Sequence, residues 1–503
     1  MRVLLYYLIA TTITFAAEIL ARPRSVAPWR RKPTSLGVHV AAVTAVFVLM
    51  LSLSARPVFS GLVCVALTAL IALINNAKHE SLKEPFVFTD LSLFSQLFHH
   101  PRLYLPFLSA DKVAAIVVGA CIFLTAFFFD TALLVVSHVE LGIVALICVG
   151  AAIVLSSRLP LTLEVASDYV ATGFIAGFIA YLCNGLRLST FRALHYAFAT
   201  GPFSRQASPS ARPDVVVIQS ESFFDARRLG AEIRQPILKN FDAACASSVQ
   251  YGRLDVPAWG ANTMRTEFAV LSGLSNEALG YARFYPYAFL RRPCLSLAAW
   301  FKRAGYRTTA IHPYHADFFG RDRAFSLMHF ERFVDVKHFA DAPRAGPYVA
   351  DSAVADAIIR ELDAASGGPS LVMAITMENH GPLHLERVVK GEAMQYHSLG
   401  DDARWSDLTA YLRHIKNADA MIGQLMHALS HRERETLVCF YGDHVPAIPR
   451  VFEALGKPLR KSDYFIWRSH GEGPSQRADI TASQLGVALI DYMEVCQPAA
   501  SLI

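Results

Sequence analysis

Four apolar runs in the second half of the chain each lead into polar side chains that are able to bind a metal ion or a phosphate. The runs are 215–218, 308–311, 371–376 and 437–441. The polar residues that follow them are Glu221, His312, Asn379 with His380, and Asp443 with His444. Continuous apolar runs of this length are typical of strands buried on both faces, as in parallel sheets. Because ligands bind at the carboxyl ends of such strands, we expect one cleft of a metal-dependent enzyme that acts on an anionic group.

Glu221, Asp443 and His444 are the predicted protein ligands of one divalent cation. The adjacent carboxylate and imidazole of Asp443 and His444 reach a single ion, and Glu221 adds a second carboxylate from another strand end. This oxygen-rich set with one imidazole suits Mn²⁺, the first choice, or Mg²⁺, and Zn²⁺ is also compatible. Each residue alone is as well explained as a solvated loop residue, so the prediction depends on their joint occurrence.

Thr263 is the predicted nucleophile, and its oxygen is a further predicted metal ligand. Glycine and small residues at 260–262 precede a helix-like stretch with Phe268, Leu271 and Leu274 on one side. Thr263 is therefore expected at the helix start, like an N-cap, where backbone N–H groups and the helix dipole favour an anion. Its hydroxyl attacks phosphorus only when a cation or base draws off the proton. The alternative is that Thr263 merely caps the helix.

Three other residues are predicted to contact the phosphate or to move protons. His312 and His380 each follow a strand, and His380 lies in the turn-like sequence Asn379-His380-Gly381-Pro382. A histidine there contacts phosphate or carries a proton to the leaving oxygen. Arg321 is predicted to fork onto a phosphate, although its spacing alone fits an ordinary surface arginine equally well.

The elements that must position these residues alternate between strand and helix. Helices are predicted over 295–304, 351–364 and 405–431, before the strands at 308, 371 and 437. Such alternation predicts a mostly parallel sheet with helices on both faces. We assign residues 214–503 to this α/β catalytic domain, and residues 191–213 to a juxtamembrane helix and linker.

Residues 1–190 are predicted to form a transmembrane domain of five or six helices. A span requires roughly 20 apolar residues, and the candidate runs are 3–20, 37–54, 58–76, 113–130, 139–156 and 170–186. Loops rich in lysine and arginine stay cytoplasmic; the basic loop residues are Arg22, Arg24, Arg30, Arg31 and Lys32, followed by Lys78, Lys83 and Arg102. With six spans, the amino terminus and the domain after the last span are expected outside the cytoplasm. With five, the amino terminus moves inside, and the domain is still expected outside because its chemistry requires it. A net charge of +5 over 503 residues, without a basic stripe, predicts no nucleic-acid partner.

The second half of the chain resembles the lipoteichoic acid synthase family. This family includes the phosphoglycerol transferases that decorate periplasmic glucans, and it belongs to the alkaline phosphatase and sulfatase superfamily. The matching segments are 217–223, 262–268 with 271–274, 379–382 and 441–444. A sulfatase requires a Cys/Ser-x-Pro-x-Arg motif at the nucleophile, which this sequence lacks, so sulfatase activity is not expected.

The resemblance implies a role for each matching residue. Glu221, Asp443 and His444 match the metal ligands, Thr263 matches the threonine that takes up phosphoglycerol covalently, and His380 matches a phosphate-contacting histidine. His312, Phe319 and Arg321 match residues that bind the substrate head group, and Phe319 stands where relatives often carry tryptophan.

The resemblance implies a membrane-anchored phosphoglycerol transferase with an alkaline-phosphatase-like catalytic domain in the periplasm or outside the cell. Its expected donor is phosphatidylglycerol in the plasma or inner membrane, and its expected acceptor is a glycan or a polyol-phosphate chain. Phosphoethanolamine transfer on the same scaffold is an alternative. An alternative of another class is a non-catalytic scaffold or transporter for envelope polysaccharide assembly.

Overall fold

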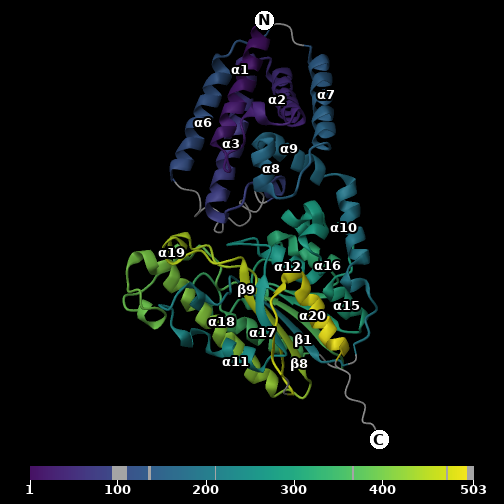
Figure 1. The fold of residues 1–503 in the computed structure, drawn as a ribbon, viewed down its shortest axis with the longest axis vertical. Coiled ribbons are helices and arrows are strands. Elements are labelled where there is room, and N and C mark those ends of the chain that lie inside the picture. The colour runs from purple at the N-terminus through teal and green to yellow at the C-terminus, as the bar shows by residue number, and fades with distance from the viewer. Residues whose placement is uncertain (93–109, 134–136, 210, 365–366, 472–473, 496–503) are drawn as a thin grey trace. The chain divides into compact units, whose positions relative to one another are not determined.

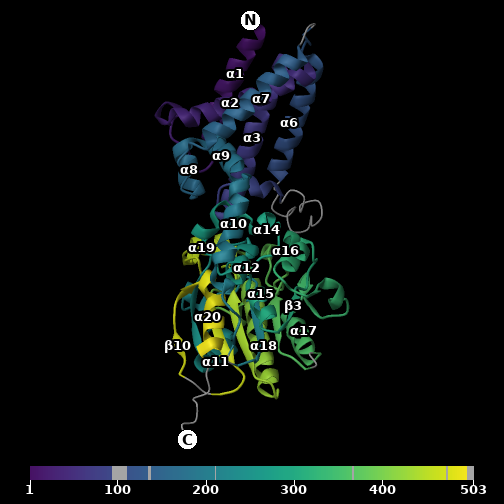
Figure 2. The same cartoon turned by 90° about the vertical axis from the view of Figure 1, so that its right-hand side faces the viewer.

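The computed structural model describes residues 1–92, 110–133, 137–209, 211–364, 367–471 and 474–495 (Figure 1). The chain divides into two compact units, Met1–Thr190 and Phe191–Ile503. The first unit is helical and the second contains the sheet, as Figure 2 also shows. Arg102, which belongs to one of the predicted basic loops, lies outside the described residues.

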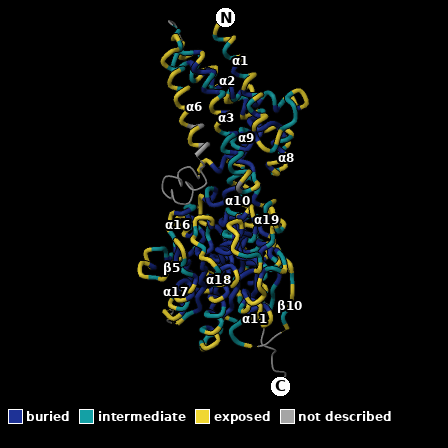
Figure 3. Tube along the Cα trace, turned by 90° about the vertical axis from the view of Figure 1, so that its left-hand side faces the viewer, coloured by how far each residue is buried: buried dark blue, intermediate teal, exposed yellow. Residues whose placement is uncertain are grey.

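The first unit consists of apolar helices. They are α1 (Arg2–Ala17), α2 (Pro33–Ser54), α3 (Pro57–Leu82), α6 (Ala110–Phe129), α7 (His138–Ser156), α8 (Val165–Thr172) and α9 (Phe174–Gly185). Among the described residues, four helical stretches are long and apolar enough to cross a membrane: Arg2–Leu20, Pro33–Ser54, Pro57–Glu80 and His138–Ser156. These stretches coincide with the first, second, third and fifth predicted spans. Many of their side chains are exposed (yellow in Figure 3), as expected for lipid-facing helices.

The fourth predicted span corresponds to one helix, α6, of which Val117–Phe129 is an apolar stretch among the described residues. The sixth predicted span differs from a single long helix. The sixth is broken at Gly173, where the backbone adopts φ +90° between α8 and α9. A Cβ at Gly173 would lie 2.0 Å from Arg31 Nη1, so the close approach of Arg31 requires glycine there.

The second unit is built on one nine-stranded sheet with the order β10-β2-β9-β8-β1-β7-β3-β4, and β11 also pairs with β2. The strands are β1 (Asp214–Ser220), β2 (Gln250–Asp255), β3 (Arg307–Ile311), β4 (Arg332–Val334), β7 (Ser370–Ile375), β8 (Thr436–Gly442), β9 (Lys461–Arg468), β10 (Gln476–Arg477) and β11 (Ile480–Thr481). The neighbours β8, β1, β7, β3 and β4 are parallel. β9 runs antiparallel to both β8 and β2. A short hairpin, β5 (Arg344–Ala345) with β6 (Tyr348–Val349), forms a separate sheet.

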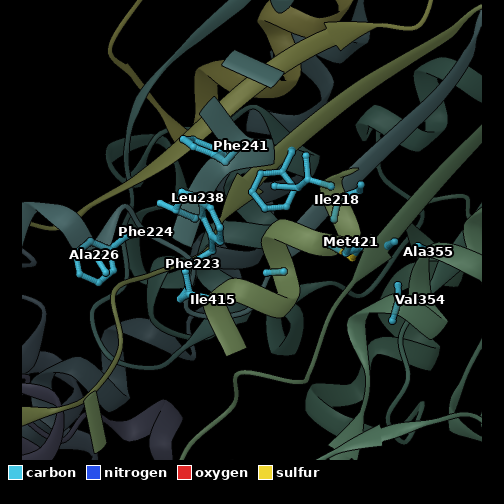
Figure 4. Close-up of a cluster of buried hydrophobic side chains, with 14 of the residues drawn as sticks. Ile218, Phe223, Phe224, Ala226, Leu238, Phe241, Val354, Ala355, Ile415 and Met421 are labelled. Carbon is cyan, nitrogen blue, oxygen red and sulfur yellow. The ribbon is translucent and has the colours of Figure 1, made fainter. Parts of the chain in front are cut away.

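Helices cover the sheet on two sides. In Figure 1, α11 (Lys239–Ser247), α17 (Asp351–Asp363) and α18 (Ser406–Ser430) lie on one side of β1 and β8, and α15 (Leu297–Arg303) and α20 (Ala482–Val495) lie on the other. On the first side a large cluster of buried side chains joins the sheet to these helices, including Ile218 of β1, Phe241 of α11 and Met421 of α18 (Figure 4). The remaining helices are α10 (Leu188–Thr200), α12 (Thr263–Ser272), α13 (Asn276–Leu279), α14 (Pro286–Phe289), α16 (Arg321–Leu327) and α19 (Pro449–Leu455).

The four predicted strands are β1, β3, β7 and β8, which are adjacent and parallel at the centre of the sheet. Every residue of β1, β7 and β8 is buried, which explains why the apolar runs are continuous. The predicted helices correspond to α15, α17 and α18. The prediction of an N-terminal multi-span helical part followed by an α/β unit with a mostly parallel sheet is confirmed.

Candidate active site

Glu221, Asp443 and His444 come together at the carboxyl ends of two neighbouring strands. β1 ends at Ser220 and β8 ends at Gly442, and these two residues pair in the parallel register. The next residues of both strands therefore leave the sheet at the same place. One ligand atom from each of the three side chains lies within 4.8 Å of the others, and all three residues are buried. The three residues thus have the spacing that one metal ion requires.

The hydrogen bonds around this cluster leave lone pairs of Asp443 and His444 directed toward its centre. Asp443 Oδ1 accepts hydrogen bonds from the backbone N–H groups of Ser222 (2.7 Å) and His444 (2.8 Å). The other oxygen, Oδ2, is buried without a hydrogen-bond partner. His444 Nδ1 lies 3.0 Å from the carbonyl of Val445, so Nδ1 carries the proton and Nε2 keeps its lone pair. Nε2 lies 3.4 Å from Asp443 Oδ2 and 3.5 Å from Glu221 Oε1.

The electrostatics of the cluster favour a bound cation. Burial, and then the neighbouring Glu221 carboxylate, raise the pKa of Asp443. Burial opposes protonation of His444, but the Asp443 and Glu221 carboxylates outweigh it and raise the pKa of that ring. A buried unpartnered oxygen is costly, and two carboxylates side by side repel each other. The residues present therefore fit a divalent cation with mostly oxygen ligands.

Thr263 lies against the same cluster, at the first position of α12. Its hydroxyl donates to Glu221 Oε2 at 3.3 Å and lies 3.4 Å from His444 Nε2. Asn262 precedes it in the left-handed conformation, with φ 69°. Thr263 is thus the first helical residue and Asn262 is the N-cap, so the expectation that Thr263 occupies the N-cap position was wrong by one residue. Thr263 therefore lies in the first turn of α12, where the helix dipole and the N–H groups of a helix start favour an anion.

His312 and Arg321 lie side by side, and both have protein partners. Arg321 is 1% exposed, and its guanidinium forms a bidentate ion pair with the carboxylate of Glu267. Nη2 lies 2.8 Å from Oε2, and Nε lies 3.0 Å from Oε1. Arg321 Nη1 also lies 3.3 Å from His312 Nε2. Burial and the Arg321 guanidinium lower the pKa of His312 well below its usual range, so the ring is neutral. Its Nδ1 donates to the carbonyl of Ile375 at 3.3 Å.

Phe319 and His380 complete the predicted set. The ring of Phe319 lies 5.2 Å from the Arg321 guanidinium, within cation–π range, and its backbone has φ 59°. His380 Nδ1 lies 2.7 Å from the carbonyl of Gly381, so this nitrogen carries the proton and Nε2 is left for other partners. His380 is close enough to His312 to contribute to its lowered pKa. Glu221, Thr263, Asp443 and His444 thus lie around one point. Phe319 and His312 contact Arg321, and His380 lies near His312.

The sequence analysis gave no role to two residues of this region, Glu267 and Tyr287. Glu267 is 0% exposed and accepts hydrogen bonds from Arg321 and from the Tyr287 hydroxyl. The signal in the sequence was a carboxylate four residues after Thr263, on the same predicted helix. The structure shows that every residue of this helix is buried, and buried carboxylates are almost always paired. Its partners are 20 and 54 residues away in sequence, so spacing did not indicate them.

Comparison with known proteins places this arrangement in a family. The sulfatase family model matches residues 213–495. Capsular polysaccharide biosynthesis protein RkpI of Rhizobium meliloti is 29% identical over 453 residues, which cover 84% of this chain and 80% of that protein. A putative cyclic beta-1,2-glucan modification protein of the same organism is 29% identical over 255 residues, 51% of this chain and 39% of that protein.

Among solved structures, lipooligosaccharide phosphoethanolamine transferase A (EptA), an integral membrane protein from Neisseria meningitidis, is similar over nearly the whole chain. The TM-score is 0.56 at 14% identity, and the match covers 98% of this chain and 94% of that one. The likeness in fold therefore extends over both the helical and the α/β unit. The predicted superfamily is confirmed. With a family model matched over more than half of its length, this chain belongs to the sulfatase family.

Proposed function

We propose that this protein is a metal-dependent phosphoglycerol transferase. It moves glycerol phosphate from phosphatidylglycerol to an extracytoplasmic glycan or polyol-phosphate acceptor through a phospho-threonine at Thr263. The observation that carries this proposal is the position of the Thr263 hydroxyl, within 3.4 Å of both Glu221 and His444 at the start of a buried helix. A hydroxyl placed beside a metal cluster and a helix N-terminus is suited to attack phosphorus.

In the first step the Thr263 hydroxyl gives up its proton to water, its oxygen bonds to the donor phosphorus, and the bond from phosphorus to the diacylglycerol oxygen breaks. A divalent cation held by Glu221, Asp443 and His444 would lower the pKa of the attacking hydroxyl and polarise the phosphoryl oxygen. The N–H groups at the start of α12 face the negative phosphoryl oxygens. The transition state thus meets donors that are already in place, which is the main source of electrostatic catalysis.

His380 is proposed to protonate the departing diacylglycerol oxygen. Its Nδ1 is engaged with the Gly381 carbonyl, so the second nitrogen, Nε2, is the one that exchanges a proton with the reactants. In the second step, an acceptor hydroxyl attacks the phosphorus of the threonine adduct, His380 Nε2 takes the acceptor proton, the bond from phosphorus to the Thr263 oxygen breaks, and that oxygen regains a proton from water. The two steps restore the enzyme.

The group around Arg321 favours glycerol over ethanolamine as the transferred head group. The carboxylate beside Arg321 belongs to Glu267, and both of its oxygens already accept hydrogen bonds from protein donors. His312 is neutral, and the Arg321 guanidinium is cationic. An ammonium group beside Arg321 would therefore meet a positive charge and a carboxylate, Glu267, whose oxygens are both engaged, whereas glycerol hydroxyls accept hydrogen bonds from arginine.

The acceptor and the location follow from the relatives and the helical unit. RkpI is named for capsular polysaccharide biosynthesis and the second relative for glucan modification, which supports a glycan acceptor. The long apolar helices support an integral membrane protein, and the basic loops support a catalytic unit outside the cytoplasm, in reach of outer-leaflet phosphatidylglycerol. An assembled ligand cluster supports an enzyme rather than a scaffold or transporter.

Phosphoethanolamine transfer is the second candidate, because the fold match over both units is to a phosphoethanolamine transferase. The test uses the purified full chain in nanodiscs that contain either phosphatidylglycerol or phosphatidylethanolamine, with Mn²⁺. We expect diacylglycerol release from phosphatidylglycerol, loss of this release with a chelator, and its return when Mn²⁺ is restored. Release from phosphatidylethanolamine alone would favour the second candidate, and release from neither lipid would overturn both.

A further inference from the structure

Glu267 is a buried carboxylate for which the chemistry above has no direct use. It lies on α12 four residues after Thr263, so the two side chains lie on the same face of the helix, one turn apart. Its Oε1 accepts from the Tyr287 hydroxyl and from Arg321 Nε, and its Oε2 accepts from Arg321 Nη2 at 2.8 Å and from Gln219 Nε2 at 3.3 Å. Both oxygens of Glu267 are thus fully engaged.

These contacts join the nucleophile helix to the head-group residues. From Glu267 the chain of buried contacts runs to Arg321 and then to His312, whose ring is anchored on the carbonyl of Ile375 in β7. In the other direction Gln219 of β1 accepts a hydrogen bond from the Tyr441 hydroxyl of β8 at 2.7 Å. Arg321 is therefore fixed against three strands of the sheet and against α12.

The ion pair with Glu267 fixes the orientation of Arg321. A guanidinium has five N–H groups, and the described contacts with Glu267 and His312 use one on each nitrogen. These contacts leave one N–H on each terminal nitrogen. Because the ion pair is buried, its attraction is much stronger than at a surface, so Glu267 sets the direction in which the guanidinium points.

We infer that Glu267 is a positioning residue for the donor head group. By holding Arg321 at a fixed place relative to Thr263, it sets the distance between the attacking hydroxyl and the glycerol hydroxyls. This inference rests on the proposed function, because it assigns Arg321 to the transferred head group. It predicts that Glu267 governs the binding of the glycerol part of the donor and leaves the phosphate and metal contacts unchanged.

The test compares Glu267→Gln with wild type in the Mn²⁺-loaded full chain. Two ligands are titrated: glycerol phosphate, which spans the phosphate and head-group positions, and inorganic phosphate, which fills only the first. We expect Glu267→Gln to weaken glycerol phosphate at least tenfold and inorganic phosphate less than twofold. The KM for phosphatidylglycerol should rise in parallel, with a smaller change in kcat. Equal weakening of both ligands, or no weakening of either, would overturn the inference.

Two further variants keep the test decisive if Glu267→Gln fails to fold. Tyr287→Phe removes one donor to Glu267 and preserves the ion pair, and it should weaken glycerol phosphate two- to fivefold without affecting inorganic phosphate. If Tyr287→Phe binds both ligands like wild type, the inference is wrong. The matched control is Asp214→Asn, which alters another buried carboxylate, paired with Arg432 at the opposite end of β1. This control should lower stability and leave the ratio of the two affinities unchanged.

The outcomes separate the inference from the proposed function. Diacylglycerol release from phosphatidylglycerol by wild type reports the proposed function, whereas the ratio of the two affinities in the variants reports the role of Glu267. If wild type releases diacylglycerol and the variants keep the wild-type ratio of the two affinities, only the inference is contradicted. Wild type that binds glycerol phosphate no better than inorganic phosphate removes the head-group assignment and the inference with it.

Discussion

Two groups of side chains with buried carboxylates lie at α12, and they differ in how their carboxylate oxygens are hydrogen-bonded. In the first, beside Thr263, Glu221 and Asp443 crowd together and Asp443 Oδ2 has no hydrogen-bond partner. In the second, one turn along the helix, Glu267 accepts hydrogen bonds on both oxygens and pairs with Arg321. The first group fits a cation from solution, whereas the carboxylate of the second is paired with a cation of the chain, Arg321.

The difference assigns a task to each group. Buried like charges without a partner destabilise a protein, so such a cluster persists where an ion binding to it compensates the cost. A fully bonded buried ion pair fixes its members in one geometry. The first group is thus suited to chemistry that an exchangeable ion supports. The second is suited to fixing the orientation of Arg321 for recognition. The predictions that follow separate these tasks.

The largest effect is expected for Thr263→Ala, which removes the hydroxyl and its hydrogen bond to Glu221 but leaves every carboxylate of both groups in place. Turnover of phosphatidylglycerol should fall by at least about 10³-fold, because the attacking atom is absent. Metal content, measured by elemental analysis, and thermal stability should remain close to wild type. Turnover near the wild-type rate would show that another group attacks phosphorus.

His380→Ala should have the next largest effect. Loss of a positioned acid and base slows turnover by roughly 10²-fold, while Glu221, Asp443 and His444 still hold the ion. Steady-state rates with bound Mn²⁺ measured on the same sample test this. Loss of metal in this variant would mean that His380 belongs to the ion site and not to proton transfer.

Glu267→Gln and Asp443→Asn should change the stability of the metal-free protein in opposite directions. The first variant leaves Arg321 buried without its carboxylate, and breaking such a pair costs about 3–5 kcal/mol. The second removes a like charge from a crowded cluster and should stabilise the metal-free protein by about 1 kcal/mol. Chemical unfolding with chelator present measures both. Two changes of the same sign would contradict the contrast between the two groups.

Asp443→Asn should also weaken Mn²⁺ binding at least about tenfold, because an amide oxygen replaces a charged ligand. Titration of the metal-free full chain with Mn²⁺ gives the affinity. The control is Asp214→Asn, whose carboxylate lies at the opposite end of β1 and should leave the affinity unchanged. Unaltered affinity in Asp443→Asn would remove this residue from the ligand set.

A change in stability that depends on pH, with no change in chemistry, is expected at a third buried group that resembles the second. His414 lies between Glu378 and Glu386, 2.9 Å from each. Burial opposes charge on the ring, but its hydrogen bonds to Glu378 and Glu386 outweigh burial and raise the pKa of His414 to about 9. The raised pKa stabilises the fold by an amount on the order of 3 kcal/mol. This stabilisation is complete below about pH 6.5 and is lost as the pH rises through about 9.

His414→Gln tests this pH dependence. The difference in unfolding free energy between wild type and the variant should shrink as the pH rises from 6 to 10. A difference that stays constant over this range would show that His414 is not held as a cation.

The cluster of Glu221, Asp443 and His444 could be predicted from sequence because buried parallel strands have continuous apolar runs. The first polar residues after each run mark the end of the strand. Glu221 and Asp443 follow β1 and β8 directly, and adjacency of those strands was sufficient to bring them together. The antiparallel β9 was not predicted, since β7 and β8 already accounted for the apolar runs used. The break at Gly173 was also missed, because hydropathy does not report the side chain of Arg31 that packs against it.

The pairing of Arg321 could not be predicted in the same way. Its partner Glu267 lies on a different helix 54 residues earlier, and no periodicity relates the two. An arginine after aromatic residues indicated anion binding, and the structure adds that a protein carboxylate takes half of its fork. Contacts between distant elements depend on how the helices pack, which local patterns do not record.

The central claim is tested most directly by mass spectrometry of the peptide that contains Thr263. Trypsin releases residues 254–265, Leu-Asp-Val-Pro-Ala-Trp-Gly-Ala-Asn-Thr-Met-Arg, in which Thr263 is the single side chain with a hydroxyl. After incubation of the full chain with Mn²⁺ and phosphatidylglycerol labelled in the head group, and rapid acid quenching, we predict that this peptide carries the labelled glycerol phosphate. A peptide that stays unmodified while labelled diester is consumed, or a label found on another residue, would contradict the account.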